Sequence, residues 1–421
     1  MGMKMSFVSG RISRVLLGTA LVVSGAGCAA RSGGHAAAAA GRSDADAGGG
    51  RGTVVSVTPV VRMSRAQVRD YLGDEGLTSP PRSGVSGFKV LYRTVSATGR
   101  PTLASGVVVL PSDTTGTLQA VSFTHGTHAG RSTAGSVAAD GQSRIAAVYY
   151  AAAGYAGVAP DYLGLGEGPG AHPYLDAESE ASASLDMLRA ARDVATRQGR
   201  GLERRVLVTG FSQGGQAAMA LGRQLQRGAD PYLRLGALAP VSGTYDLRRA
   251  QLPASLSGDS LDPRVSAFNL AYATVAWNRL HHLYKDPSEV FQAPYDTTVE
   301  QLFDGSHDES DIFPQLPASP EELVTPRYLH WLKQPSGALL RAIRAADGTC
   351  DWAPDVPIRL YGASGDEQVT YGNTRNCVRA LRARGTRPQV VDYGTGSGTD
   401  HFATLHRALP DTLHWFRALP A

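Results

Sequence analysis

The segment GFSQGG, residues 210–215, places a serine between glycines, after an apolar run and before a helical pattern. In the pattern Gly-x-Ser-x-Gly, Gly210 and Gly214 leave room for a sharp strand-to-helix turn that projects the hydroxyl of Ser212. The following helix would direct its N-terminus to the same point, where the backbone N–H of Gln213 can stabilise an oxyanion. Because the same pattern also occurs as a plain glycine turn, a catalytic serine needs partners elsewhere in the chain.

A serine nucleophile needs a general base and an acid that orients this base. The segment IRLYGASGDEQV runs from an apolar stretch through a glycine turn to Asp366, and QVVDYGTGSGTDHF leads into His401. Each residue follows a predicted strand, and Ser, Asp, His is the chain order required in the fold class where a catalytic serine sits on a strand-to-helix turn. Glu367 and Asp400 are alternatives for the acid. We favour Asp366 because it directly follows the strand and the tight turn.

The second donor to an oxyanion is expected in the loop after another predicted strand, in the stretch VSFTHGTH. Gly126 lets the backbone turn its N–H groups inward, so we expect the N–H of Thr127 to be this donor, with His128 as the alternative. In a purely structural interpretation, His125 and His128 only stabilise the loop.

The sequence predicts no metal and no cofactor. Neither HxxxH nor HExxH occurs, so no metal site is expected. The glycine-dense segment APDYLGLGEGPGAHPYL is not a dinucleotide motif, because Pro169 takes the place of the last glycine and Glu167 would face a pyrophosphate. We expect this loop to form a wall of the active-site mouth, fixed by hydrogen bonds of Asp161 and Tyr162.

The elements that would position these residues alternate between strands and helices. Two strands are expected as an antiparallel pair, and the other strands are short apolar runs separated by helical patterns. The expected strands are 88–95, 102–110, 118–123, 155–160, 205–209, 235–241, 358–363 and 389–393, and the first helices are 143–154 and 177–199. Such an alternation predicts an α/β fold with a mostly parallel sheet, flanked by helices on both faces.

Residues 247–352 interrupt the alternation with helical sequence. A helix begins at Asp262 and Pro263, SPEELVTPRYLHWL repeats this start with Ser319 and Pro320, and SGALLRAIRAAD gives a third helix. A helical insertion between two sheet strands predicts a cap or lid domain, because a sheet accepts long excursions only at its loop ends. The expected α/β core comprises residues 53–246 and 353–421.

The N-terminal residues predict export. Basic residues precede the apolar run VLLGTALVV, which is too short to span a membrane and indicates a bacterial export signal over residues 1–28. Cys28 stands where a lipoprotein signal places its acylated cysteine, although such signals usually have Leu where this chain has Gly25. The alternatives are anchoring to a membrane through Cys28 and simple cleavage with secretion. Residues 29–52, rich in Ala, Gly and Ser, are expected to be a flexible linker.

The composition argues against one class of function, and the cysteine count predicts a disulfide. The 421 residues carry 41 basic and 37 acidic side chains, scattered without basic runs, which argues against nucleic-acid binding. In an oxidising compartment Cys350 and Cys377 form an even pair and predict a disulfide, which would stabilise the fold by about 3 kcal/mol. Two unrelated buried thiols are the alternative interpretation.

Together, PDYLGLGEGPGAHPYL, GFSQGG, the helical insertion and the late acid and histidine resemble the secretory lipase family of α/β-hydrolases. This family includes fungal lipase A-like enzymes and bacterial exported esterases, and the similarity spans about residues 85–418. The resemblance implies a carboxylic ester hydrolase without a cofactor, a cap that forms an acyl-binding tunnel or lid, and a triad of Ser212, Asp366 and His401. Fungal members often carry an acidic residue near the oxyanion position, where this chain has Thr127.

The sequence therefore predicts an exported serine carboxylic ester hydrolase, a lipase or esterase, that forms an acyl-enzyme on Ser212. Its partner would be a small-molecule or lipid ester, and no oligomeric state is indicated. An acyltransferase or an amidase or peptidase could use the same triad, although the loop THGT lacks the HGGPG-like pattern of many amidases of this fold. A surface binding protein that kept the fold and lost the chemistry is the alternative from another class.

Overall fold

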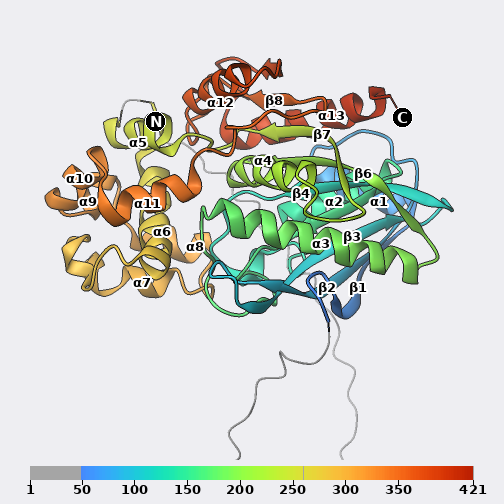
Figure 1. Cartoon of the computed structure of the whole chain (residues 1–421), viewed down its shortest axis with the longest axis horizontal. Coiled ribbons are helices and arrows are strands. Elements are labelled where there is room, and N and C mark those ends of the chain that lie inside the picture. Colours follow the sequence, from blue (N-terminus) through green and yellow to red (C-terminus); the bar gives the residue numbers. More distant parts are fainter. Residues whose placement is uncertain (1–48, 259, 421) are drawn as a thin grey trace, which may run out of the picture. The chain divides into compact units, whose positions relative to one another are not determined.

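The computed structural model describes residues 49–258 and 260–420, which lie within one unit of the chain (Figure 1). The expected export signal at 1–28, with Cys28, and residues 29–48 of the expected linker lie outside the described residues. The last residues of that expected linker, 49–52, belong to the fold. The backbone N–H of Gly52 donates a 2.8 Å hydrogen bond to the carbonyl of Arg93, so the fold begins slightly earlier than expected.

The described chain contains a nine-stranded sheet, in the order β1-β2-β3-β5-β4-β6-β7-β8-β9. Its first pairs, up to β3 with β5, are antiparallel, and all later pairs are parallel. The strands are β1 (Val54–Met63), β2 (Val85–Val95), β3 (Pro101–Pro111), β4 (Thr117–Thr124), β5 (Ala156–Pro160), β6 (Gly201–Phe211), β7 (Arg234–Val241), β8 (Arg359–Gly362) and β9 (Gln389–Asp392).

The mostly parallel sheet with an antiparallel start confirms the predicted fold class. Every strand expected from the sequence is present, and β1 is an addition at the edge of the sheet. Most residues of β1 are partly or fully exposed, and its pairing register with β2 shifts after Pro59. Proline is tolerated at an edge because an edge strand needs fewer backbone donors.

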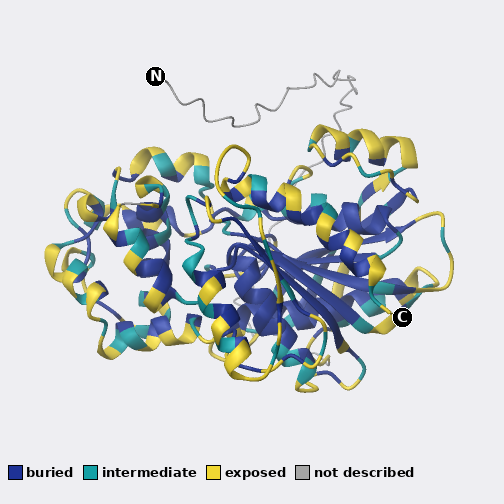
Figure 2. Cartoon of the chain, turned by 90° about the horizontal axis from the view of Figure 1, so that it is seen from above, coloured by how far each residue is buried: buried dark blue, intermediate teal, exposed yellow. Residues whose placement is uncertain are grey.

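Helices cover both faces of the sheet, and the central strands between them are buried (Figure 2). Side chains of β6 alternate between two hydrophobic clusters: Val206 and Val208 join one cluster, and Leu207 joins the other. The first cluster contains side chains of α3 (Ala177–Arg197), α4 (Gln213–Gln226) and α12 (Gly372–Ala383). The second contains side chains of α1 (Arg65–Asp74), α2 (Gln142–Ala152) and α13 (His401–Ala418).

The chain between β7 and β8 is mainly helical and builds a hydrophobic cluster of its own, which also takes in a few loop residues of the core. In Figure 1 these helices gather on one side of the sheet. They are α5 (Leu252–Ser257), α6 (Pro263–His281), α7 (Val299–Leu302), α8 (Glu309–Ile312), α9 (Pro320–Leu323), α10 (Pro326–Lys333) and α11 (Gly337–Ala346). As expected, Asp262 caps α6 by accepting from the backbone N–H groups of Arg264 and Val265.

The segment SPEELVTPRYLHWL differs from its prediction as a single helix. It forms α9 and α10, which are separated at Val324 and Thr325. Thr325 accepts a 3.2 Å hydrogen bond from the N–H of Tyr328, and Pro326 occupies the first helical position. Because Pro326 has no N–H to donate to an earlier turn, a new helix starts here.

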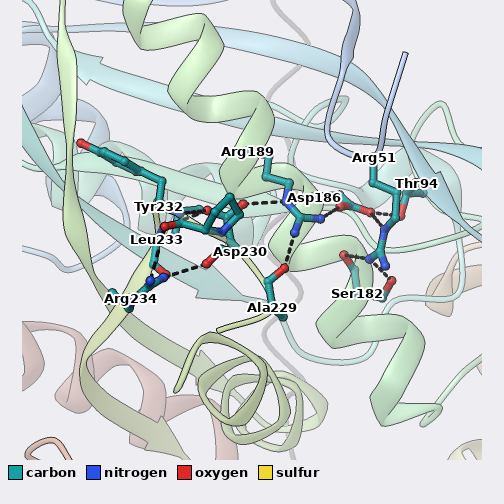
Figure 3. A network of polar contacts seen from close by, with 11 residues as sticks. Arg51, Thr94, Ser182, Asp186, Arg189, Ala229, Asp230, Tyr232, Leu233 and Arg234 are labelled. Carbon is teal, nitrogen blue, oxygen red and sulfur yellow. Dashed lines mark hydrogen bonds and ion pairs between the residues drawn. The ribbon is translucent and has the colours of Figure 1, made fainter. Parts of the chain in front are cut away.

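A polar network ties the start of the described chain to α3 (Figure 3). The side chain of Asp186 is fully buried and accepts hydrogen bonds from Arg51 Nε at 3.0 Å and from Thr94 Oγ1 at 2.7 Å. Arg189 donates to the same carboxylate at 2.6 Å and to Asp230 at 2.8 Å. The residues directly before β1 are therefore anchored to a helix of the core.

Cys350 and Cys377 are joined in a disulfide, with their Cα atoms 5.3 Å apart, which confirms the predicted pair. The bridge connects the end of the insertion to α12, and both residues belong to the core cluster. Within residues 49–258 and 260–420, no helix has the length and apolar character needed to cross a bilayer.

Candidate active site

The predicted site residues all follow the carboxyl ends of parallel strands. Ser212 follows β6, Asp366 lies after β8, His401 opens α13 after β9, and Thr127 lies in the loop after β4. Since these strands run in the same direction in one sheet, their carboxyl ends share one edge. The loops that carry the candidate residues therefore meet at that edge.

Ser212 has a strained backbone, with φ 59° and ψ −124°. A non-glycine residue rarely adopts a positive φ, and this strain is typical of functional turns. A Cβ on Gly210 would lie 2.0 Å from Thr124 Oγ1, and one on Gly214 would lie 2.0 Å from the Thr124 carbonyl oxygen. Both glycines of the motif are therefore needed for the close contact between β4 and the turn.

Asp366 and His401 are in direct contact. Nδ1 of His401 lies 2.8 Å from Oδ2 of Asp366, and both side chains are almost fully buried. The other carboxylate oxygen, Oδ1, accepts from the backbone N–H groups of Gln368 at 3.0 Å and Val369 at 2.9 Å. Burial alone would raise the pKa of Asp366, but His401 and these N–H donors together hold it below its usual value. The carboxylate therefore stays ionised beside the imidazole.

The two alternative acids have other partners. Glu367 Oε2 accepts a 3.0 Å hydrogen bond from the backbone N–H of His401, and Asp400 caps α13 by accepting from the N–H of Ala403 at 2.9 Å. Neither carboxylate has a hydrogen bond to the imidazole ring in the described part of the chain. Asp366 is thus the acid that meets the ring of His401.

His401 lies beside the serine turn without a hydrogen bond to it. Among the described residues, no hydrogen bond joins the Ser212 hydroxyl to the imidazole. The ring of His401 packs instead on Phe211, the residue before Ser212, with ring centroids 4.4 Å apart. Catalytic hydrogen bonds often tighten only when substrate binds, so this geometry is compatible with proton transfer between the two residues.

The loop after β4 lies against Ser212. A Cβ built on Gly126 would be 3.4 Å from the Cβ of Ser212. In this loop the N–H of Gly126 donates to Gln142 at 3.0 Å, and the N–H of Ala129 donates to Glu309 at 2.8 Å.

These bonds leave two N–H groups of the loop available. Among the described residues, the backbone N–H groups of Thr127 and His128 have no partner, and neither does that of Gln213 at the start of α4. Unpaired N–H groups beside a serine turn can bind an oxyanion. The predicted donors, Thr127 and Gln213, are thus both available, and so is the alternative, His128.

Side chains of the insertion hold this loop in place. Thr127 Oγ1 lies 2.8 Å from the hydroxyl of Tyr174, which donates to Asn269 of α6 at 3.3 Å. The hydroxyl of Tyr272, also on α6, donates to the carbonyl of His128 at 3.1 Å. The position of the loop therefore depends on the helices of the insertion.

The glycine-dense loop after β5 is fixed as the sequence predicted. Asp161 is fully buried and accepts from Ser105 Oγ at 2.6 Å, and Tyr162 donates to the carbonyl of His125 at 3.1 Å. Burial lowers the pKa of His125 to about 3, so this histidine is neutral and supports the loop. Within the described residues, no cluster of His, Cys, Asp or Glu has an arrangement suited to a metal ion.

One buried acid near the site is absent from the predictions. Glu180 of α3 accepts a 2.6 Å hydrogen bond from the side chain of Gln213, the residue after Ser212. In the sequence, Glu180 shares a four-residue spacing with Ser184 and Leu188, which are also buried. This spacing on one helix face is the signal that could have indicated a buried acid.

The comparisons with known proteins agree with this architecture. No protein-family model matches the sequence, and no curated protein does. Among solved structures, the chain is similar to the rice cell wall degrading esterase LipA from Xanthomonas oryzae, with 29% identity and a TM-score of 0.79 over 88% of this chain and 98% of that one. A Legionella pneumophila protein gives the same TM-score of 0.79 at 26% identity, over 86% of this chain and 97% of that one.

A more distant match shares the fold alone. Candida antarctica lipase A has 15% identity and a TM-score of 0.61, over 86% of this chain and 79% of that chain.

The fold and the arrangement at the sheet edge are those of an α/β-hydrolase. Within this class, the similarity to the Xanthomonas oryzae esterase confirms the resemblance to bacterial esterases, and Candida antarctica lipase A shares the fold. They also support the class of serine ester hydrolase.

Proposed function

We propose that this chain is an exported serine carboxylic ester hydrolase in which Ser212 is the nucleophile, His401 the general base and Asp366 the acid that orients it. The observation that carries the proposal is the buried contact of Asp366 with His401, whose ring lies against the residue preceding a strained serine. The likeness to the esterase from Xanthomonas oryzae supports the same reaction class.

The hydrogen bond to Asp366 fixes the protonation of the histidine. If Nδ1 of His401 carries the proton donated to Asp366, then Nε2 presents a lone pair that can accept the proton of the Ser212 hydroxyl. The serine oxygen attacks the ester carbonyl, and the alcohol leaves with the proton returned by His401. Water then hydrolyses the acyl-enzyme by the same transfer, which regenerates the serine.

The oxyanion formed in each step would be held by backbone N–H groups of Gln213 and Thr127. Both groups lack a partner in the described part of the chain, and the loop of Thr127 packs on the serine turn. Two such donors lower the barrier because they are already oriented toward the developing charge.

We infer that residues 247–352 act as a cap over this edge of the core, which comprises residues 53–246 and 353–421. Two hydrogen bonds of α6 favour this assignment. Tyr272 donates to the carbonyl of His128 in the loop after β4, and Asn269 accepts from Tyr174, which lies against the same loop. A cap that forms one side of the site would bind the acyl group of an ester substrate.

The remaining proposals concern location. A signal at residues 1–28, acylation of Cys28 and a linker that follows it would place the enzyme outside the cytoplasm or on a membrane surface. The disulfide is compatible with this location because disulfides persist in oxidising compartments. Mass spectrometry of the mature N-terminus tests it: an acylated Cys28 supports anchoring, and an unmodified terminus beyond residue 28 supports secretion.

The decisive experiment is Ser212→Ala, assayed with nitrophenyl esters and a fluorophosphonate label. We expect loss of both ester turnover and labelling. A matched control is Ser242→Ala, because Ser242 follows β7 at the same edge, is also buried and also has a positive φ of 43°. Full activity and labelling of the Ser212 variant would overturn the proposal, and a wild type that never labels would favour a binding protein.

Turnover of nitroanilides by the wild type tests the amidase or peptidase alternative, and acyl transfer to added alcohols tests the acyltransferase.

A further inference from the structure

A buried polar chain lies directly behind the serine turn. Glu180, on α3, is 1% exposed, and its Oε1 accepts a 2.6 Å hydrogen bond from Nε2 of Gln213. The same amide nitrogen lies 2.9 Å from Nε2 of His172. Gln213, also 1% exposed, is therefore held from two sides by residues that lie outside the catalytic triad.

The donors and acceptors of this chain can be assigned. Nδ1 of His172 lies 2.9 Å from the carbonyl of Leu163, which can only accept, so Nδ1 carries the proton. Nε2 of His172 is then an acceptor and takes one amide hydrogen of Gln213, while Glu180 takes the other. Burial lowers the pKa of His172 to about 3, in agreement with a neutral ring.

This assignment fixes what Gln213 can do. Both hydrogens of its side-chain amide are engaged away from the serine, so its contribution to an oxyanion must come from the backbone N–H. That backbone belongs to the residue directly after the strained Ser212. Holding the side chain at its far end limits rotation of the peptide that carries the N–H.

Among the residues that the structure describes, no cation acts on Glu180. Its neighbours are Gln213 of α4, the loop residues His172, Tyr162 and Tyr174, Tyr272 of α6, and Asp176 at the start of its own helix. Burial raises the pKa of Glu180 to about 8, and Asp176 adds to this effect, while the hydrogen bond from Gln213 opposes it. Glu180 is thus mainly a neutral acid at pH 7.

We propose that Glu180 is a positioning residue of the oxyanion hole, acting through the side chain of Gln213. The inference rests on the proposed function, because it assumes that the Gln213 N–H binds the oxyanion.

The position of Glu180 also predicts a pH dependence of turnover. When Glu180 ionises at alkaline pH, a negative charge appears next to the residue that must stabilise the oxyanion, so turnover should fall.

The test uses the full chain with Glu180→Ala, Glu180→Gln and Glu178→Ala. Glu178 is a matched control, because it also lies on α3 and accepts from a glutamine of α4, Gln224, at 2.7 Å, but on the exposed surface. Rates are divided by the number of sites that a fluorophosphonate labels at completion, so unfolded protein does not count. The affinity of a trifluoromethyl ketone, which mimics the tetrahedral intermediate, is measured beside ester turnover.

We expect Glu180→Ala to lower kcat by about 10- to 100-fold, because a misplaced donor costs about this much. KM should change less than about 3-fold, and the affinity for the ketone should fall in parallel with kcat. Glu178→Ala should leave all three quantities unchanged. Glu180→Gln keeps the accepting oxygen, so its kcat at pH 7 should stay within about 3-fold of the wild type.

The pH profile separates positioning from simple support of the fold. The kcat of the wild type should decline as pH rises through about 8, the value for Glu180. In Glu180→Gln this decline should disappear, because glutamine cannot ionise.

The proposal is overturned if Glu180→Ala keeps the kcat and ketone affinity of the wild type. It is also overturned if this variant loses only the fraction of sites that label, because that result describes a structural residue. An alkaline decline that persists in Glu180→Gln counts against it as well. Failure of the proposed function is distinguishable, since it would appear as activity in Ser212→Ala.

Discussion

Asp366 accepts a 2.8 Å hydrogen bond from the ring of His401, although the two residues are 35 positions apart in the chain. The neighbouring acid, Glu367, binds the backbone N–H of the same histidine at 3.0 Å. One carboxylate thus orients the ring and the other holds the main chain, and this division of roles can be tested by substitution.

We expect Asp366→Asn to lower kcat by about 10³- to 10⁴-fold, because an amide no longer favours the required histidine tautomer or its protonated form. Glu367→Gln should keep kcat within about 10-fold, since its amide oxygen can still accept from the backbone. Asp400→Ala should lower the free energy of unfolding by about 1 kcal/mol through loss of the cap of α13. Steady-state ester hydrolysis and chemical denaturation measure these effects. A greater loss of kcat in the Glu367 variant than in the Asp366 variant would contradict the assignment.

The two ends of the insertion meet at Asp347. Its carboxylate accepts from the backbone N–H of Leu247 at 2.6 Å, and burial with nearby Asp246 raises its pKa to about 6. Because this value exceeds that of an unfolded Asp, the contribution to stability is present at low pH and is lost as pH rises through 6. We expect the wild type to gain stability relative to Asp347→Asn when pH is lowered from 8 to 5. Thermal unfolding across this range measures the gap, and parallel curves would contradict the prediction.

The two partners that anchor the start of the described chain, Arg51 and Asp186, should contribute unequally to the free energy of unfolding. Asp186 is fully buried, whereas the side chain of Arg51 is 42% exposed. Asp186→Ala leaves Arg189 and Thr94 without their shared acceptor and should cost about 3–5 kcal/mol. Arg51→Ala should cost less than about 1 kcal/mol, as is usual for an exposed ion-pair partner. Urea denaturation of both variants provides the comparison, and equal losses would show that the anchor is not organised around Asp186.

The disulfide should contribute to stability without being required for the site. Cys350 and Cys377 enclose a loop with a sequence separation of 27, so the double variant with alanine should lose about 3 kcal/mol of unfolding free energy. A reducing agent should lower the melting temperature of the wild type and leave that of the double variant unchanged. If the reducing agent lowers the melting temperature of both proteins equally, its effect does not come from this disulfide, and the prediction is wrong.

Most of the fold could be predicted because the strands of the sheet are short apolar runs bounded by turn residues. β1 was not predicted, since its residues are mostly exposed and Pro59 interrupts the pattern. The expected helix from Ser319 is divided because the cap of Thr325 and the missing N–H of Pro326 outweigh its helical periodicity. The sequence contains both signals, but it does not show which of them prevails.

The part of the candidate site that could be predicted is the part that the order of the strands determines. Candidates after β6, β8 and β9 had to meet at one edge, so the proximity of Asp366 to His401 followed from topology. The contact of Glu180 with Gln213 depends instead on how α3 packs against α4. Packing of two helices is a tertiary property, so the spacing on α3 could indicate that this acid is buried, but not that it contacts the residue after the serine.

Substitution by alanine should have very different effects on stability and activity at two glycines near Ser212, Gly214 and Gly126. A Cβ on Gly214 would lie 2.0 Å from the Thr124 carbonyl, so Gly214→Ala must displace backbone and should cost more than about 3 kcal/mol of unfolding free energy. A Cβ on Gly126 would be 3.4 Å from Ser212 Cβ, which the fold can tolerate with small shifts. Gly126→Ala should therefore fold with less than about 1 kcal/mol of destabilisation and lower kcat/KM by about 10-fold, because it moves the loop after β4 against Ser212, the proposed nucleophile. Gly73→Ala, with open space around its Cβ, is the control. Unfolding curves and ester kinetics of the three variants decide the matter, and a fully active Gly126 variant would show that this loop does not contact the reacting ester.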